Sequence, residues 1–381
     1  MRADKRRRVV DEHLQSADYV RHMADTWRAA YLAAANPDDV PFLAPKWEAW
    51  FRARFRENTP YDELVRRILT APLEARPASI EVGRSTGDAD ALAFFQAGEL
   101  KPENIAGSAS RMFLGVNLDC AQCHNHPFAA WKQEQFWEFA SFFAGVTRLR
   151  DDNSFMPGPE RADVRELKVP GKEQVVQARF IDGVTPAWRS DASPRAVLAD
   201  WVTSRDNPYF ARAAVNRMWA HFLGRGFVEP LDGFGAKDYA PDEVLDLLAR
   251  EFVQQDFDLT FLVRTITSTQ AYQSSSRGTN PKQDDPKLFA RFAVRGLTPE
   301  QVYAGLLTAV GPSLRSASTS DDTDALRSDV LAKFGGLERL VERQASIVQA
   351  LTLMNGRLAT DAASLENSAP SDGGARRPVR R

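Results

Sequence analysis

Residues 102–126 read PENIAGSASRMFLGVNLDCAQCHNH, and the interpretation of the whole chain starts from this segment. Apolar side chains recur at helical spacing from Pro102 to about Leu118, and Glu103 in the first turn complements the helix dipole. The pattern predicts a helix that ends beside the sequence CAQCH at 120–124. If the helix continues as a turn, the side chains at 120, 123 and 124 point to one side.

The sequence CAQCH contains both cysteines of the chain and matches the Cys-x-x-Cys-His pattern that attaches c-type haem through two thioethers and one axial imidazole. Two cysteines and five histidines placed at random over 381 residues would form this pattern in roughly one case in ten thousand. Chance is therefore a poor explanation. The pattern predicts haem c as the cofactor, held by Cys120, Cys123 and His124.

Two alternatives to haem stay open. Zinc or another divalent metal is one, because Cys120, Cys123, His124 and His126 offer four ligands within seven residues. A metal bound by three of these side chains and a water molecule would be less strained than one bound by all four. The other is a structural or disulfide role for the cysteine pair. The candidate metal ligands among the histidines are His124, His126 and His221. For the second axial position of a haem iron, the candidates are His221, Met112, Met218 and Met354.

Most of the chain has helical periodicity, with N-cap residues followed by proline and with glycine stops. Two short runs, 166–169 and 175–181, flank a Pro-Gly-Lys turn and predict a β-hairpin. The expected fold class is mainly α, with two helical domains joined by a short β-hairpin segment. Helices are expected at 4–35, 47–55, 61–69, 102–118, 133–144, 207–224, 241–253, 298–310 and 345–354, with further helices that begin after Ser193 and Asp258.

Charge and hydropathy exclude two classes of partner. The 49 Lys and Arg against 51 Asp and Glu leave a formal charge of -2, so no field gathers nucleic acid. No apolar run approaches the roughly 20 residues of a membrane-spanning helix, and we expect no membrane span. The basic residues 5–8 lack the apolar segment of a signal peptide. Because covalent haem attachment belongs to oxidising compartments, we expect an export signal upstream of this chain.

Three groups of residues carry a family resemblance. FLGV at 113–116, CAQCHNHPF at 120–128, Trp131 and QFWEF at 135–139 resemble the planctomycete cytochrome-like domain, domain of unknown function 1549. NPYFARAAVNRMWAH at 207–221, GRG at 224–226 and AYQSS at 271–275 resemble its usual companion, the PSD domain, domain of unknown function 1553. IVQALTLMNG at 347–356 is similar to the end of the same PSD domain.

The sequence and the resemblance together predict four segments. Residues 1–147 form a cytochrome-like helical domain with the Cys-x-x-Cys-His motif, 148–190 a linker with the hairpin, 191–366 a PSD-like helical domain, and 367–381 a disordered tail. The resemblance also implies a periplasmic or cell-surface location, although this chain contains no signal peptide.

The sequence and the resemblance together predict a c-type haem-binding redox or electron-transfer module of an exported protein, with an unknown redox partner or a surface protein as its partner. The alternative is a secreted hydrolase or a binding or assembly protein in which the motif holds another metal or is structural. For a hydrolase, Asn216, Arg217 and His221 on one helix, with Asp232 after it, would bind an anionic or sugar group and supply a general base.

Overall fold

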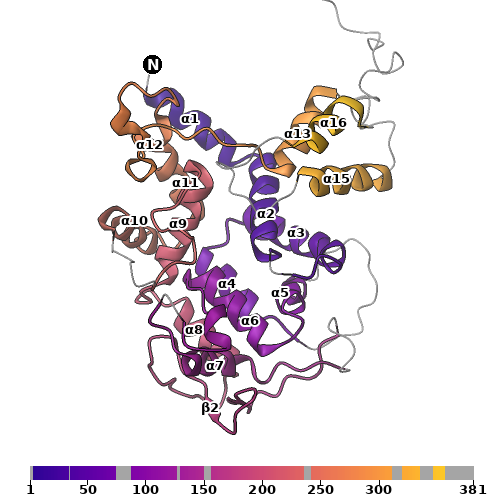
Figure 1. Cartoon of the computed structure of the whole chain (residues 1–381), viewed down its shortest axis with the longest axis vertical. Helices are drawn as coiled ribbons and strands as arrows, with labels where there is room; N and C mark the ends of the chain where they lie inside the picture. The colour runs from indigo at the N-terminus through magenta and orange to yellow at the C-terminus, as the bar shows by residue number, and fades with distance from the viewer. Residues whose placement is uncertain are drawn as a thin grey trace, which may run out of the picture. The chain divides into compact units, whose positions relative to one another are not determined.

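Helices make up nearly all of the regular structure, as the apolar periodicity predicts. The computed structural model describes residues 3–33, 35–73, 87–126, 129–149, 156–235, 242–310, 320–334 and 346–356. The chain divides into two units, unit 1 at 1–292 and unit 2 at 293–381 (Figure 1). The motif and all its neighbours lie in unit 1.

Unit 1 begins with α1 (Ala3–Leu14), α2 (Ala17–Tyr31), α3 (Val40–Arg56), α4 (Tyr61–Leu69), the 3-10 helix η1 (Gly87–Leu92) and α5 (Ala93–Ala97). It continues with α6 (Pro102–Ala109), the π turn η2 (Ser110–Leu114), the 3-10 turn η3 (Asp119–Gln122), α7 (Gln133–Ala140) and the 3-10 turn η4 (Ser141–Phe143). After strands β1 (Glu166–Lys168) and β2 (Val175–Gln177) come α8 (Pro194–Val202), α9 (Phe210–Leu223), α10 (Glu243–Gln254), α11 (Leu259–Ser268), α12 (Gln270–Gln273), η5 (Pro281–Asp284) and η6 (Pro286–Leu288).

Unit 2 contains α13 (Pro299–Val310), α15 (Ser320–Phe334) and α16 (Ile347–Asn355). Its small core forms where Val330 and Phe334 of α15 pack against Val302, Tyr303 and Leu306 of α13.

Local capping places several helices where the sequence predicts them. Ser193 Oγ accepts a hydrogen bond from the Ala196 backbone N–H at the start of α8, and Asn207 Oδ1 accepts one from Phe210 at the start of α9. The helix expected at 4–35 is wrong as one element. It divides at Ser16, whose Oγ accepts from the Tyr19 N–H and so begins a second helix.

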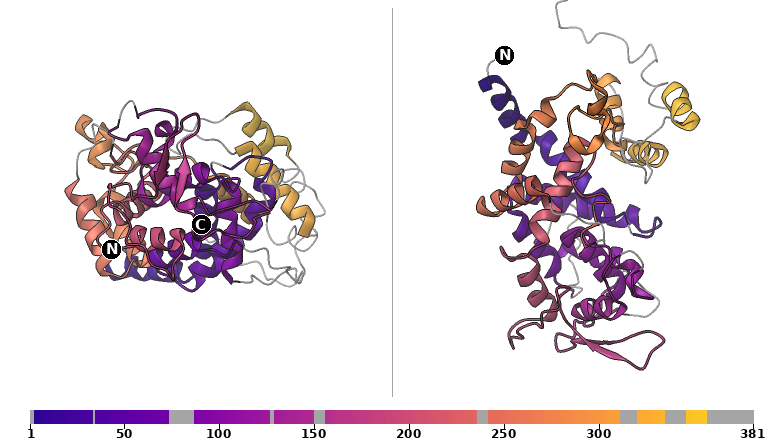
Figure 2. Two further views of the ribbon diagram at one scale, coloured as in Figure 1. Left: turned by 90° about the horizontal axis from the view of Figure 1, so that it is seen from below. Right: turned by 60° about the vertical axis from the view of Figure 1, so that its left-hand side comes forward.

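The predicted hairpin is present and lies between the two helical regions. It is the one sheet of the described residues, so the mainly α fold class is confirmed. Strands β1 and β2 pair antiparallel with Leu167 opposite Val176. Gly171 in the connecting turn has φ +74°, a conformation that glycine adopts without strain. Figures 1 and 2 show the hairpin at the end of unit 1 opposite α1.

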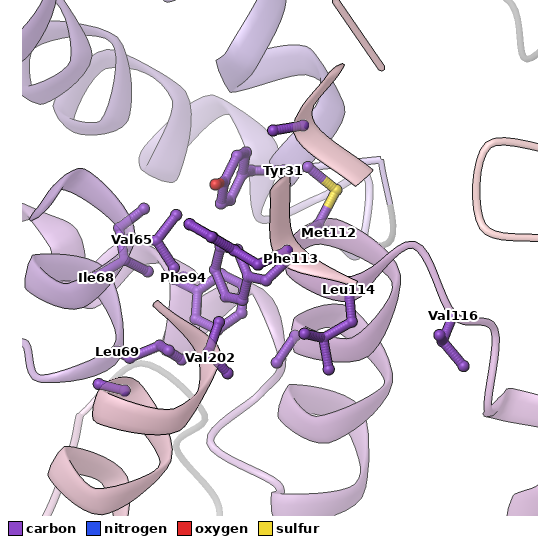
Figure 3. Packing of buried hydrophobic residues seen from close by; sticks show 14 of the residues in the cluster. Tyr31, Val65, Ile68, Leu69, Phe94, Met112, Phe113, Leu114, Val116 and Val202 are labelled. Carbon is purple, nitrogen blue, oxygen red and sulfur yellow. The ribbon is translucent and has the colours of Figure 1, made fainter. Parts of the chain in front are cut away.

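One continuous core runs through both helical regions of unit 1. Phe113 of η2 is completely buried and lies against Phe94 and Tyr31, with ring centroids 5.4 and 5.8 Å away (Figure 3). The Tyr61 ring of α4 stacks on the Phe210 ring of α9 at 5.0 Å. The two predicted domains therefore stabilise each other by sharing buried apolar surface.

The predicted domain boundaries stay predictions, because the shared core does not mark them. Parts of two predicted segments lie outside the described residues: residues 151–155 of the linker, and the tail at 367–381.

The buried tyrosines predict how the stability of the folded chain depends on alkaline pH. Burial raises the pKa of Tyr31 and Tyr61 well above the ordinary value, and the nearby Arg217 charge offsets only part of that effect. The folded chain therefore keeps protons that the unfolded chain loses above about pH 10. We expect the free energy of unfolding to be insensitive to these groups below that pH and to fall as the pH rises above it.

The measurement is tyrosinate absorbance followed together with helical circular dichroism during an alkaline titration. The rise in absorbance from Tyr31 and Tyr61 should coincide with loss of helix. The variant Tyr61→Phe should make this rise smaller and leave the earlier ionisation of the other tyrosines unchanged. Complete ionisation of all tyrosines while the helical signal persists would contradict the prediction.

Candidate cofactor site

The helix that approaches the motif ends earlier than the sequence predicts. Regular α-helix stops at Ala109, and η2 ends at Leu114, where it is capped by Gly115, which has φ +64°. A Cβ at Gly115 would lie 2.6 Å from Cδ2 of Phe234, so both the left-handed backbone and the close packing require glycine. The predicted continuation to Leu118 is wrong for this reason, and the motif lies on a separate turn.

The segment after Gly115 is held by a loop from the second helical region. The Asn117 backbone N–H donates to the Asp232 carbonyl at 2.9 Å, and the Phe234 N–H donates to the Gly115 carbonyl at 3.0 Å. Val116 forms an isolated antiparallel bridge with Gly233. The loop at 232–234 therefore positions the chain that leads into the motif.

The first three residues of the motif lie on the turn η3. Asn117 Oδ1 accepts a hydrogen bond from the Asp119 N–H at 3.0 Å at the start of that turn. Ala121 is completely buried and anchors the turn to the core. The carboxylate of Asp119 pairs with the guanidinium of Arg111. Burial lowers the pKa of Arg111, and the negative charge of Asp232 opposes that shift.

Helix α7 holds the backbone of the motif from the other side. The Gln133 side-chain amide donates to the carbonyl of Gln122 at 3.1 Å and to that of Cys123 at 3.0 Å. The Trp137 indole N–H also donates to the Gln122 carbonyl, at 3.0 Å. The Gln133 backbone N–H donates to Asn125 Oδ1 at 3.0 Å. Four hydrogen bonds thus fix the turn without using a thiol or an imidazole.

The reactive side chains of the motif are exposed. Cys120 and Cys123 are free thiols at the surface. The His124 ring is also exposed, and its Nδ1 lies 2.8 Å from the backbone carbonyl of Asn125. Because a carbonyl can only accept, this contact places a hydrogen on Nδ1, so that Nε2 has the lone pair in the neutral ring. His126 is half-buried, and its backbone N–H donates to the Trp131 carbonyl.

The aromatic side chains of α7 and η4 belong to the core. Phe136, Phe139 and Phe143 are each at most 1% exposed, so their rings pack inside unit 1. Met112 and Met218, two candidates for a second axial ligand, are also buried. A porphyrin on the exposed motif would therefore lie on the surface of unit 1 rather than against a wall formed by these three rings.

The three histidines predicted as metal ligands do not gather into one site. Among the described residues, no group of three or more His, Cys, Asp or Glu side chains could hold a metal ion. The structure therefore does not group His221 with His124 and His126. Instead, Nε2 of His221 lies 3.1 Å from Nε2 of His22. The sequence offers no local signal for His22, which lies 199 residues away.

The residues proposed for a hydrolase have packing roles. Asn216 is completely buried, and its side chain makes two hydrogen bonds to the backbone of Val228. Arg217 Nη2 donates to the Arg111 carbonyl at 3.2 Å. Gln133 and Trp137 are the positioning residues that sequence reasoning missed. Their bonds cross 10 to 15 residues and go to backbone carbonyls, which no side-chain pattern marks.

Comparison with known proteins gives two matches in the order that the resemblance predicts. Residues 1–148 match the family model PSCyt2, a protein of unknown function (DUF1549). Residues 194–324 match the family model PSD1, a protein of unknown function (DUF1553). No curated protein and no solved structure matches the chain. Within the described segments, no helix combines the length and apolar character that crossing a membrane requires.

Proposed function

Since the chain belongs to the proteins in which a PSCyt2 domain precedes a PSD1 domain, we propose that its 120–124 turn binds haem c covalently. The protein would then be a redox or electron-transfer module of an exported protein. The observation that carries the proposal is the pairing of two exposed free thiols with an imidazole whose Nε2 is left for a metal.

The described side chains suit the chemistry of attachment. Cys120 and Cys123 would form the two thioethers, which requires that each sulfur be accessible and not joined to the other. His124 would supply the axial nitrogen. Its Nδ1–H donates to the Asn125 carbonyl, which orients the ring and makes Nε2 a stronger donor. Bound haem would supply a one-electron centre at this position.

The surroundings of the turn support a rigid attachment point. Gln133 and Trp137 hold the carbonyls of Gln122 and Cys123, so the turn between the thiols is ordered by α7. The exposure of the turn leaves one side of the site open to another protein. An unknown redox partner or surface protein at that side, and a periplasmic or cell-surface location, are parts of the same proposal.

The test is expression behind an export signal together with a cytochrome c maturation system. We expect the band of the chain on a denaturing gel to stain for haem, and the pyridine haemochrome spectrum to show a c-type centre. The double variant Cys120→Ala, Cys123→Ala should lose all covalent haem, because no thiol remains to form a thioether.

The matched control is His126→Gln, which alters a neighbouring imidazole that the haem proposal does not use. It should stain like the parent. A colourless parent band would end the haem proposal, and metal analysis of that protein would then separate zinc or another divalent metal from a structural turn. Loss of bound metal in His126→Gln would favour the metal alternative.

A further inference from the structure

Two imidazoles from distant parts of the sequence face each other in unit 1. His22 belongs to α2 and His221 to the last turn of α9. Their Nε2 atoms lie 3.1 Å apart, and the ring centroids are 5.1 Å apart with an angle of 41° between the ring planes. Both side chains are half-buried. Each helix is fixed by the core, since Met23 and Met218 beside this pair are almost completely buried.

The distance between the two nitrogens is compatible with a shared metal ion. Zinc lies about 2.0–2.1 Å from a histidine nitrogen. Two such bonds separate the nitrogens by about 3.3–3.4 Å at a tetrahedral angle and by about 2.8–3.0 Å at a right angle. The observed 3.1 Å lies between these two geometries. Without a metal, the same distance fits a hydrogen bond in which one Nε2–H donates to the other Nε2.

We propose that His22 and His221 form a binding site for a divalent transition metal ion, with the ion in place of the shared hydrogen and with water in the remaining positions. Imidazole nitrogen favours copper, nickel and zinc over magnesium and calcium. The ion would join α2, in the PSCyt2 segment, to α9, in the PSD1 segment. This site uses none of the thiols of the proposed haem site and stands or falls independently of it.

The test uses the full chain made without haem maturation, in a background that removes the motif as a competing ligand. Cys120→Ala, Cys123→Ala and His124→Gln all replace exposed side chains. Titration of this protein with Cu²⁺ should show one bound equivalent whose electron paramagnetic resonance spectrum contains two imidazole nitrogens. Cu²⁺ should also displace Zn²⁺ bound at this site, because nitrogen ligands bind Cu²⁺ more tightly. His22→Gln and His221→Gln should each lower the Cu²⁺ affinity by at least about tenfold.

His13→Gln is the matched control, because it removes a single exposed imidazole on α1. Its affinity should equal that of the background protein. Unchanged copper affinity in both His22→Gln and His221→Gln would overturn the proposal. If neither variant folds, the test is a copper titration of the background protein followed by NMR. Copper should broaden the ring resonances of His22 and His221 first. Broadening that begins at His13 or His126 would overturn the proposal.

Discussion

Replacing Arg195 with methionine is expected to lower the free energy of unfolding of unit 1 by about 3 kcal/mol, because it removes the buried guanidinium of an ion pair whose carboxylate, on Glu160, is 20% exposed. Arg195 is only 3% exposed. Its Nε donates to Glu160 Oε1 at 2.8 Å, and its Nη2 donates to Glu160 Oε2, so the pair is bidentate. In the variant, the carboxylate of Glu160 would remain without this partner.

The same guanidinium joins three parts of the chain. Nη1 donates to the carbonyl of Leu69, the last residue of α4, at 2.8 Å and to that of Ala71 at 3.1 Å. The cation also lies over the Phe95 ring, 4.9 Å from its centroid. Arg195 lies at the start of the PSD1 segment, and Leu69 and Phe95 belong to the PSCyt2 segment. The variant is therefore expected to be less stable because the two helical regions lose these contacts with each other.

Chemical denaturation followed by circular dichroism measures the effect, and Arg189→Met provides the control. Arg189 is 57% exposed and pairs with Asp200 at the surface, so its loss should cost less than about 1 kcal/mol. Equal midpoints for the two variants would show that the Arg195 contacts contribute little to stability.

Replacing Asn216 with leucine is expected to cost about 2–5 kcal/mol, because two buried backbone groups lose their partners at once. Asn216 Nδ2 donates to the Val228 carbonyl at 2.9 Å, and the Val228 N–H donates to Asn216 Oδ1 at 3.0 Å. Leucine has the same branched arrangement of heavy atoms, with bulkier methyl groups, and makes neither bond. Gly226 passes so close that a Cβ there would lie 2.6 Å from Asn216 Oδ1.

Thermal and denaturant unfolding measure this cost. Gln254→Leu is the control, since it places the same side chain at an exposed amide on α10 and should stay within about 0.5 kcal/mol of the parent. The result also bears on the hydrolase alternative. A large loss of stability fits the packing role of Asn216, whereas a stable Asn216→Leu protein would return this residue to the candidates for ligand binding.

Much of the local structure could be predicted because its causes lie within a few residues. Asn207 and Ser193 cap the helices that follow them, and Gly171 closes the hairpin turn. The motif could also be recognised, since the two thiols and the imidazole of 120–124 are contiguous. The end of η2 could have been predicted from Gly115. The close approach of Gly115 to Phe234 could not.

The amino-acid sequence by itself determined the helical class, the hairpin, the family and the residues of the candidate haem site, because capping, periodicity and a contiguous motif act over short distances along the chain. Only the tertiary structure decided which partners these residues have. Arg195 reaches Leu69 across 126 residues, and His22 reaches His221 across 199. Such pairs form when helices pack to bury a common core, and the backbone carbonyls and imidazoles involved leave no periodic trace in the sequence.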